Sequence, residues 1–465
     1  MTLTVLSDHQ VQTLLEGLDL DELDQFRCVL AEALHEFSTN ADADGFYQQP
    51  HRLSTVDPAS RATTLYMPVS GPEGLGCKVV CLPSSDAPDD STEKSSRNRS
   101  GRPMRPTGVV NILSPAGELL GLVHASTLTA FRTALGSACL LNRRNQVKTI
   151  TVFGSGTQAY WHVRIALMMR GSTIKRVNII NRRFSNNAGH ILKSFTAIPS
   201  AIRDREGWSN TKFGILTPTF HEYERLLKDQ VRGSDVIYCC TPSRQDLFDA
   251  SILTSHEGRK KGRLIVAVGS YTPEMRELPE GLLLQATRQH EGNRRHFHKH
   301  AEEAGVIVVD TLEGVLKEAG EIIAARVNPN QLVELGELVM LNRLAVEESE
   351  MTTPGCQTPP STAENDYFGN VDKKLSPSTL LGDPPRSPTS PLSHSRKPSL
   401  PLPFRKSSSS SLDGERKKED SLARWLRDGT VVYKSVGLAL MDLVVGLQLI
   451  KLANSKGIGT QIEGF

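Results

Sequence analysis

Short apolar runs alternate with amphipathic segments through the middle of the chain. The runs carry few charges, which is typical of strands buried on both faces of a parallel sheet. The segments between them have the apolar spacing of helices. Strands are expected at 147–153, 176–180, 234–240, 263–268 and 306–310, and a helix at 157–169. The alternation predicts an α/β fold, a Rossmann-like doubly wound parallel sheet over about 145–330.

Two polar segments interrupt this pattern, 84–106 and about 350–420. Both are rich in Ser, Pro and charged residues and bury too little apolar surface to offset chain entropy, so we expect disordered insertions. The predicted domains are 1–144 for substrate binding and dimerisation, 145–343 for NAD(P) binding, a disordered insertion at 344–425, and 426–465 returning to complete the first domain as a second α+β unit.

Composition narrows the class of protein. The 465 residues carry 54 Lys and Arg against 52 Asp and Glu, a net charge of +2 that gives no reason to expect a nucleic-acid partner. The seven cysteines show no CxxC spacing, and the acidic N-terminal segment lacks the features of a targeting peptide, so we expect buried, reduced thiols in the cytoplasm. The apolar stretch 436–453 contains Asp442, which favours a core or interface helix over a membrane span.

The segment VFGSGTQA carries a GxGxxA pattern between a predicted strand and a predicted helix. Gly154 allows the tight turn, Gly156 lets the backbone approach a pyrophosphate, and Ala159 keeps the helix close to the strand. The helix start, with Thr157 and Gln158, offers free N–H groups to phosphates. This context favours dinucleotide binding over a simple tight turn.

The end of the second predicted strand bears on which dinucleotide binds. An NAD site usually has a carboxylate there, whereas this strand ends on Asn181, Arg182 and Arg183. Two guanidiniums suit a 2′-phosphate, so NADP(H) is favoured and NAD(H) stays possible. The alternative is that both arginines are merely solvated. Thr241 follows the strand at 234–240 and is a further cofactor-side candidate, because ligands lie at the carboxyl ends of such strands.

Motifs along nearly the whole chain outside the insertions resemble, in order, the ornithine cyclodeaminase/mu-crystallin family, which also includes alanine dehydrogenases and ketimine reductases. The matching segments are PHRL, LYMPV, GCKVV, GLVHASTLTAFRTALGSA, VFGSGTQA, NRR, DVIYCCTPS, VAVGSYTPEMREL, VVDT, EAGEI and YKSVGLALMDL. The resemblance implies a bilobed protein that usually forms a homodimer and acts on a small amino or imino acid.

The resemblance also assigns roles to basic residues. By match to the family, Arg52, Lys78 and Arg132 hold the substrate α-carboxylate, which suits guanidiniums and a lysine within an apolar run. The alternatives are an exposed loop arginine for Arg52, an edge-strand residue for Lys78 and a helix-surface charge for Arg132.

Tyr271 follows the strand at 263–268, where ornithine-deaminating relatives have an aspartate. A phenol is a poor base at neutral pH and cannot pair with a cationic amine as a carboxylate does. Lys78, Arg132 and Tyr271 are the candidate catalytic residues, with Tyr271, a water or Lys78 as the acid for a substrate nitrogen. The alternative for Tyr271 is a packing residue that closes the pocket.

Three functions follow as hypotheses. The first is NADP(H)-dependent reduction of a C=N bond next to a carboxylate, or oxidation of the matching amino acid. The second is ornithine cyclodeamination to proline and ammonia, against which Tyr271 argues. The third is a non-catalytic NADPH-dependent binding or regulatory protein. His124 is a weak site candidate, and HFHKH at 296–300 is interpreted as a solvated surface, so no metal site is expected.

Overall fold

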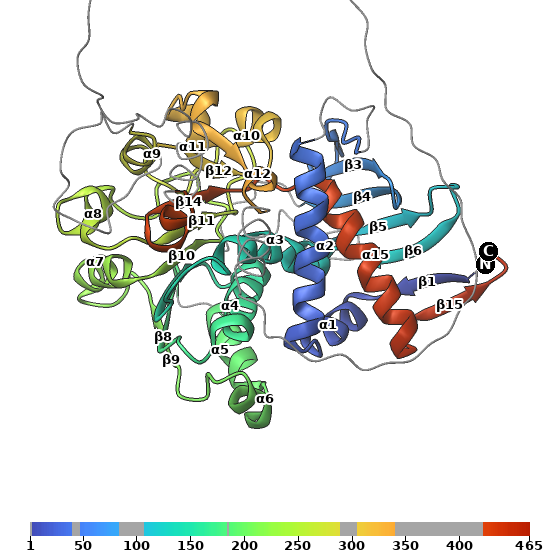
Figure 1. Cartoon of the computed structure of the whole chain (residues 1–465), viewed down its shortest axis with the longest axis horizontal. Helices are drawn as coiled ribbons and strands as arrows, with labels where there is room; N and C mark the ends of the chain where they lie inside the picture. The colour runs from blue at the N-terminus through green and yellow to red at the C-terminus, as the bar shows by residue number, and fades with distance from the viewer. Residues whose placement is uncertain (1, 40–46, 83–106, 184–185, 289–304, 340–421) are drawn as a thin grey trace, which may run out of the picture.

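The computed structural model describes residues 2–39, 47–82, 107–183, 186–288, 305–339 and 422–465. These form two lobes, each built around one β-sheet, with the N- and C-terminal segments together in the first lobe (Figure 1). The predicted insertion at 84–106, the HFHKH segment and nearly all of 344–425 lie outside the described residues. The chain is described again from 422, so residues 422–425 of the predicted insertion belong to the described part.

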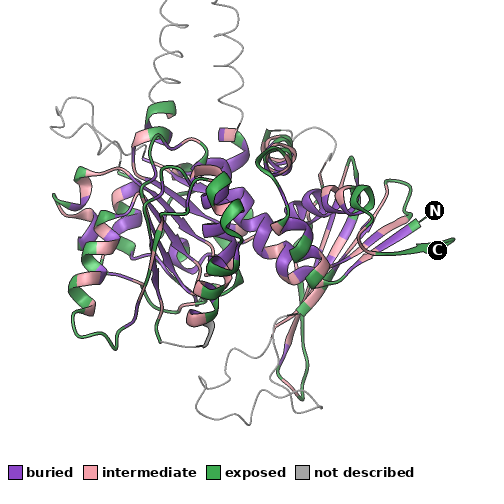
Figure 2. Ribbon diagram, turned by 90° about the horizontal axis from the view of Figure 1, so that it is seen from below, coloured by how far each residue is buried: buried purple, intermediate pink, exposed green. Residues whose placement is uncertain are grey.

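The second lobe contains an eight-stranded sheet in which every pairing is parallel. The central strands are mainly apolar and almost entirely buried, as helices on both faces require (Figure 2). The predicted doubly wound fold is therefore confirmed. In sheet order the strands are β13 (Leu332–Glu334), β12 (Ile307–Val309), β14 (Val431–Lys434), β11 (Leu264–Ala267), β10 (Val236–Cys239), β7 (Thr149–Phe153), β8 (Arg176–Ile180) and β9 (Lys212–Leu216).

The direction of winding reverses at β7. After β7 the chain adds β8 and β9 on one side, and then returns to place β10 on the other side. In open parallel sheets this reversal point is where ligands bind, beyond the carboxyl ends of the strands. Helix α4 (Thr157–Arg170) starts directly after β7 at this edge.

Strand β14 corrects one sequence-based assignment. All of 426–465 is predicted to complete the first domain, but β14 pairs in parallel with β11 and β12 inside the second sheet. Only the chain beyond it, from helix α15 (Ala439–Lys456) to β15 (Thr460–Glu463), joins the first lobe. The returning segment therefore contributes to both lobes.

The first lobe contains a seven-stranded sheet against which α15 packs, and α2 (Leu20–Thr39) packs on α15 (Figure 1). Helix α1 (Asp8–Glu16) begins with a capping box formed by Ser7 and Gln10. In sheet order the strands are β15, β1 (Thr2–Leu6), β6 (Leu119–His124), β5 (Thr107–Leu113), β4 (Gly74–Leu82), β3 (Thr63–Gly71) and β2 (Leu53–Val56).

Helix α3 (Ala125–Leu141) joins the two lobes. Almost all of its side chains are buried, because it packs on α2 and α15 of the first lobe and on α4 of the second. A helix that is apolar around most of its circumference belongs in such a core. It carries Arg132 into the region between the sheets.

Helix α15 and the cysteines are both expected to be buried. Within the described ranges, no helix combines the length and apolar character needed to cross a bilayer, and α15 is largely buried in the core as expected. The six described cysteines form no disulfide. Cys139 and Cys239 are buried, but the other four are only partly buried, so the expectation of buried thiols is wrong for those four.

Candidate active site

A cavity of about 330 Å³ lies between the lobes, where the ends of β10 and β11 face β3, β4 and α3. This volume is in the range of small-ligand pockets. Much of the wall is apolar, with Leu65 and Met67 from β3 and Val80 and Leu82 from β4. None of the described residues that line it is an aspartate or a glutamate.

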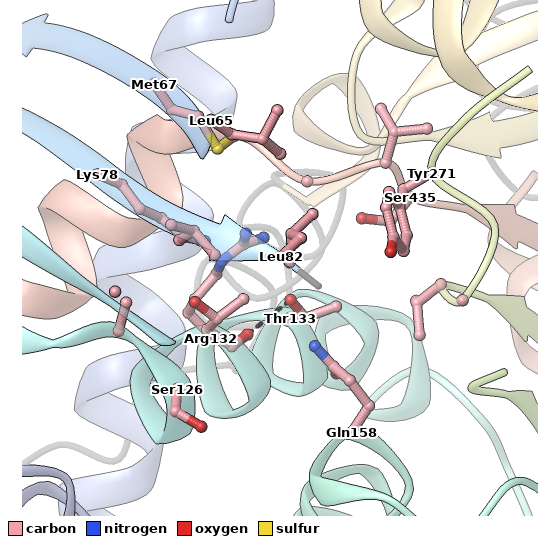
Figure 3. A pocket seen from close by; sticks show the side chains of 18 of the residues that line it. Leu65, Met67, Lys78, Leu82, Ser126, Arg132, Thr133, Gln158, Tyr271 and Ser435 are labelled. Atoms are coloured by element: carbon pink, nitrogen blue, oxygen red, sulfur yellow. Dashed lines mark hydrogen bonds between the residues drawn. The ribbon is translucent and has the colours of Figure 1, made fainter. Parts of the chain in front are cut away.

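The four residues that the sequence analysis assigned to substrate handling all line this cavity. Lys78 and Arg132 approach it from the first-lobe side, and Tyr271 lies across from them (Figure 3). Arg52 lies at the same cavity, on the segment before β2. The structure therefore brings together cations from three separate parts of the sequence.

Lys78 and Arg132 share one buried carboxylate. Lys78 Nζ lies 3.3 and 3.2 Å from the two carboxylate oxygens of Asp442 on α15, and Arg132 Nε lies 3.2 Å from Oδ1. All three side chains are almost fully buried. The sequence predicts a substrate as the anionic partner of Lys78, but the protein itself supplies one, Asp442.

Burial lowers the pKa of Lys78 to about 8, with the Asp442 carboxylate opposing that shift and Arg132 adding to it. Taking an ammonium out of water disfavours its charged form, and a second cation nearby does the same. Lys78 therefore keeps its proton at neutral pH mainly because Asp442 faces it.

The turn after β14 forms the wall next to Arg132. Asp310 Oδ2 accepts hydrogen bonds from the Ser435 hydroxyl at 2.7 Å and from the backbone N–H groups of Val436 and Gly437 at 3.0 and 2.7 Å. Gly437 has a φ of 92°, and a Cβ there would lie 3.0 Å from Arg132 Nη2. A glycine is required for this close approach.

Arg52 is engaged differently from the other two cations. Its guanidinium donates a hydrogen bond to Glu318 at the end of α10 (Leu312–Glu318) in the second lobe. Both side chains are largely buried. Arg52 is therefore not an exposed loop arginine, but its charge is matched by Glu318 across the two lobes.

Tyr271 lies beyond the end of β11 and is half-buried. Burial raises the pKa of its phenol, and the positive charge of Arg52 opposes that shift. The phenol is therefore neutral throughout the physiological range. It can donate a hydrogen bond or a proton, but it cannot act as a carboxylate.

The buried carboxylate of Glu277 holds the strand ends next to the cavity. Glu277 Oε1 accepts hydrogen bonds from Thr241 N at 2.7 Å and Oγ1 at 3.1 Å, while Oε2 accepts from Gly269 N at 2.6 Å and Ser270 N at 3.2 Å. Burial raises the pKa of Glu277 to about 7, with Lys434 opposing the shift. This clamp fixes the loop that carries Tyr271 and places Thr241 at the sheet edge.

The predicted cofactor loop has the geometry that a dinucleotide needs. Gly154 has a φ of 106°, and a Cβ there would lie 2.9 Å from the Cys240 carbonyl oxygen. Gly156 is the N-cap of α4 and has no atom within 4 Å of its Cβ position, so a phosphate has room to approach the backbone. Ala159 is fully buried against the sheet, and Gln158 lines the cavity. These residues, with Thr157, fit a pyrophosphate next to the cavity.

Asn181, Arg182 and Arg183 follow β8 at the same sheet edge, as the sequence analysis expects. The Asn181 Nδ2 donates to the Arg183 carbonyl oxygen at 2.7 Å, and both arginines are exposed. Whether they bind a phosphate stays a prediction.

His124 has a structural role in this fold. It is the N-cap of α3: its Nδ1 lies 3.3 Å from the Ser126 N–H and 3.2 Å from an Asp8 carboxylate oxygen. It is not among the residues that line the cavity. Within the described ranges, no group of three or more His, Cys, Asp or Glu is placed to hold a metal ion.

Sequence reasoning assigned no site role to four carboxylates that organise the site: Asp442, Glu318, Glu277 and Asp310. The sequence signal for Asp442 is strong in retrospect, because it is an acid within the otherwise apolar first half of α15. A buried charge needs a partner, and two cations inside apolar segments were already candidates.

No family model matches the sequence. Individual relatives do. An uncharacterised protein of Saccharomyces cerevisiae is 26% identical over 377 residues, which cover 77% of this chain and 91% of the relative. The ketimine reductase mu-crystallin of Macropus fuliginosus is 24% identical over 318 residues, 67% of this chain and 80% of the relative.

Solved structures show the same fold. The Δ1-pyrroline-2-carboxylate reductase of Thermococcus litoralis, in complex with NADH and L-proline, is similar with a TM-score of 0.59 and 17% identity, covering 99% of this chain and 100% of that one. A probable ornithine cyclodeaminase of Bordetella pertussis has a TM-score of 0.57 and 16% identity, covering 98% and 99%.

Proposed function

The chain belongs to the ornithine cyclodeaminase and mu-crystallin family of NAD(P)-dependent oxidoreductases, and we propose that it reduces a C=N bond next to a carboxylate, or oxidises the matching amino acid. One observation carries the proposal. Lys78 and Arg132 present two cationic donors to a largely apolar cavity that borders the dinucleotide loop.

These two cations form the binding site for the substrate carboxylate, which we call the carboxylate seat. Asp442 accepts from Arg132 Nε, and the sulfur of Met441 lies 3.4 Å from Nη1, whereas Nη2 has no hydrogen-bond partner among the described residues. A charge-assisted bond from Nη2 and another from the Lys78 ammonium would orient a carboxylate in the cavity. The imine carbon is then held next to Gln158 and the strand ends.

A nicotinamide cofactor held at the dinucleotide loop would supply the hydride. The chain's own residues hold and orient the reactants: Gly154, Gly156 and the start of α4 receive the pyrophosphate, and Thr241 borders the same edge. The apolar wall from β3 and β4 limits the access of water to the reacting carbon.

Tyr271 is the proposed proton donor to the substrate nitrogen. Its phenol is neutral, it lies across the cavity from the carboxylate seat, and the Glu277 clamp fixes the loop before it. A neutral phenol can give up a proton to the nitrogen as the hydride arrives.

Ornithine cyclodeamination fits this cavity less well. Its substrate carries a second amine that is a cation at neutral pH, and the described lining contains no carboxylate to receive it. The nearby carboxylates Asp442 and Glu318 are already paired with Lys78, Arg132 and Arg52. We therefore propose an imine as the substrate instead of a diamine.

NADPH is the proposed reductant, because the residues after β8 are Asn181, Arg182 and Arg183 and include no carboxylate for a ribose 2′-hydroxyl. The two arginines offer the charge that a 2′-phosphate requires.

A homodimer through the first lobe is part of the proposal. Leu53, Tyr66, Val79 and Val109 stand opposite one another in register on β2, β3, β4 and β5, so they form one row across the sheet. Leu53 is 67% exposed, and Tyr66 and Val109 are 36% and 37% exposed. An exposed apolar row of this kind is typical of a surface that a partner covers.

The test is NADPH oxidation by the purified protein with Δ1-pyrroline-2-carboxylate and Δ1-piperideine-2-carboxylate. NADH with the same acids, and ornithine with NAD, are run in parallel. The proposal expects turnover with at least one cyclic imine and faster turnover with NADPH than with NADH. Tight NADPH binding without turnover would point to a binding protein, and formation of proline from ornithine would point to a cyclodeaminase; either result would refute the proposal.

A further inference from the structure

The segment from 435 to 442 builds much of the carboxylate seat, although it follows a long stretch of chain in sequence. Asp310 fixes its first turn, Gly437 packs against the Arg132 guanidinium, and Asp442 contacts both Arg132 and Lys78. Asp442 is 1% exposed. It lies behind the two cations and is not among the residues that line the cavity.

Charged side chains from several elements lie around Lys78. Helix α15 supplies Asp442, α3 supplies Arg132, and the segment before β2 supplies Arg52, whose charge is matched by Glu318 of α10. The strands on either side of β4 place uncharged Met67 and Val110 opposite Lys78. Asp442 is therefore the only carboxylate within salt-bridge distance of Lys78 among the described residues.

We propose that Asp442 is a positioning residue of this site: it holds the Lys78 ammonium and the Arg132 guanidinium side by side and neutralises one of their two charges, so that the pair accepts a single carboxylate. The identity of the ligand as a carboxylate rests on the proposed function. The pairing role of Asp442 rests on the contacts alone.

Lys78 and Arg132 would respond differently to the loss of Asp442. Without Asp442, two buried like charges would face each other, and the lysine can relieve this by losing its proton, whereas the arginine cannot. Asp442 therefore keeps Lys78 charged while leaving one positive charge for the ligand. A substrate with one carboxylate and an otherwise uncharged body matches this charge and the apolar wall.

The experiment measures the protonation of Lys78 directly and needs no substrate. Acetic anhydride modifies only deprotonated amines, so acetylation of the peptide that contains Lys78 is followed by mass spectrometry from about pH 6 to about pH 10. In Asp442→Asn the midpoint is expected to fall by about 1 to 3 pH units, the shift that an adjacent opposite charge produces. Asp442→Glu, which keeps the charge, is expected to restore most of it.

An unchanged midpoint in Asp442→Asn would overturn the proposal. Folding is monitored by NADPH binding and thermal unfolding, and Asp442→Ser, which also removes the charge, replaces Asp442→Asn if that variant does not fold. A second readout is the dissociation constant of pyrrole-2-carboxylate, an aromatic carboxylate with no C=N bond to reduce. We expect roughly tenfold weaker binding at pH 7 in Asp442→Asn, as loss of one charge-assisted bond implies. Tighter binding would mean that Asp442 only repels the ligand, and would also overturn the proposal.

The positioning role of Asp442 and the proposed reaction can be refuted independently of each other. If the midpoint falls in Asp442→Asn while the wild type reduces no cyclic imine, the positioning role stands and the proposed reaction is wrong. If the wild type reduces the imine and the midpoint does not move, the proposed reaction stands and the positioning role is wrong.

Discussion

Lys78 and Asp442 are 364 positions apart in the sequence, yet Lys78 Nζ lies 3.2 Å from an Asp442 carboxylate oxygen in the core of the first lobe. Strand β4 and helix α15 pack directly on each other, and this packing brings Lys78 and Asp442 together. The relationship explains how a lysine can be buried and still charged at neutral pH. It also makes the site sensitive to pH in a defined direction.

Ligand binding should weaken in alkali. Lys78 has a pKa of about 8, so it is largely protonated below pH 8 and neutral above it. The dissociation constant of pyrrole-2-carboxylate, measured by calorimetry with NADPH present, should be constant below about pH 7 and rise by about tenfold per pH unit well above pH 8, once the neutral form predominates. In Lys78→Arg the side chain stays charged, so this rise should disappear. A flat profile in the wild type up to about pH 10 would contradict the assignment of Lys78 to the carboxylate.

Arg132→Lys should weaken the site although the charge is kept. A lysine cannot bond to Asp442 through one nitrogen and present another to the cavity as Arg132 does. Loss of one charge-assisted hydrogen bond costs about 1.5–3 kcal/mol, which is roughly a 10- to 150-fold loss in kcat/KM. Steady-state kinetics with a cyclic imine measure it. The matched control is Arg143→Lys, just beyond the end of the helix that carries Arg132. It is expected to leave kcat/KM unchanged, because Arg143 bonds to the Leu338 and Val339 carbonyl oxygens and does not line the cavity.

Tyr271→Phe should separate acid catalysis from packing. The ring is kept and only the hydroxyl is lost, so the shape of the cavity is preserved. If the phenol donates the proton, kcat should fall by about 100-fold or more, while KM changes by no more than about threefold. Equal kcat in both proteins would show that Tyr271 only closes the cavity. Because burial raises the pKa of the phenol, the alkaline decline assigned to Lys78 should keep its midpoint in this variant.

At two glycines of the cofactor loop, substitution by alanine should affect different properties, stability at Gly154 and NADPH binding at Gly156. Gly154→Ala forces a side chain into a φ of 106° and against Cys240, so it should lower stability by about 1–3 kcal/mol. Gly156 has a φ of −87° and open space at its Cβ position, so Gly156→Ala should leave Tm unchanged. It should nevertheless weaken NADPH binding about tenfold or more, because the methyl group lies where the pyrophosphate approaches. Thermal unfolding and fluorescence titration measure the two effects, and unchanged NADPH binding in Gly156→Ala would contradict the placement of the cofactor.

Arg182 and Arg183, which follow β8, should determine the preference of the protein for NADPH over NADH. In Arg182→Ser/Arg183→Ser the dissociation constant for NADPH should rise roughly 10- to 150-fold. That for NADH should change little, because the 2′-phosphate is the group that the guanidiniums are proposed to meet. Fluorescence titration with both nucleotides measures the ratio. Equal weakening for NADPH and NADH would show that these arginines do not recognise the 2′-phosphate.

The elements that the sequence predicts are those encoded locally. The turn at Gly154 between β7 and α4 follows from adjacent residues, and α4 begins at Thr157 as expected. The family resemblance, and not the local pattern, assigns Lys78 and Arg132 to one site, while the apolar run around Lys78 indicates only that its charge needs an anionic partner. The family resemblance supplied their common ligand.

The features that the sequence does not reveal depend on pairing between distant segments. The position of Val431–Lys434 between β11 and β12 is set by packing with strands far away along the chain, and its apolar pattern fits either lobe. The partners of Lys78 and Arg52 were missed for the same reason. Asp442 and Glu318 lie in helices whose packing faces the sequence alone does not orient toward those cations.

The central claim is that a hydride reaches the carbon next to the substrate carboxylate. The most direct measurement uses NADPH deuterated at C4 of the nicotinamide, in each of its two stereoisomers, with Δ1-piperideine-2-carboxylate and the purified protein, and mass and NMR spectra of the amino acid formed. The account predicts one deuterium at the α-carbon from one of the two stereoisomers. Product without deuterium from either stereoisomer, or no product while NADPH remains bound, would contradict it.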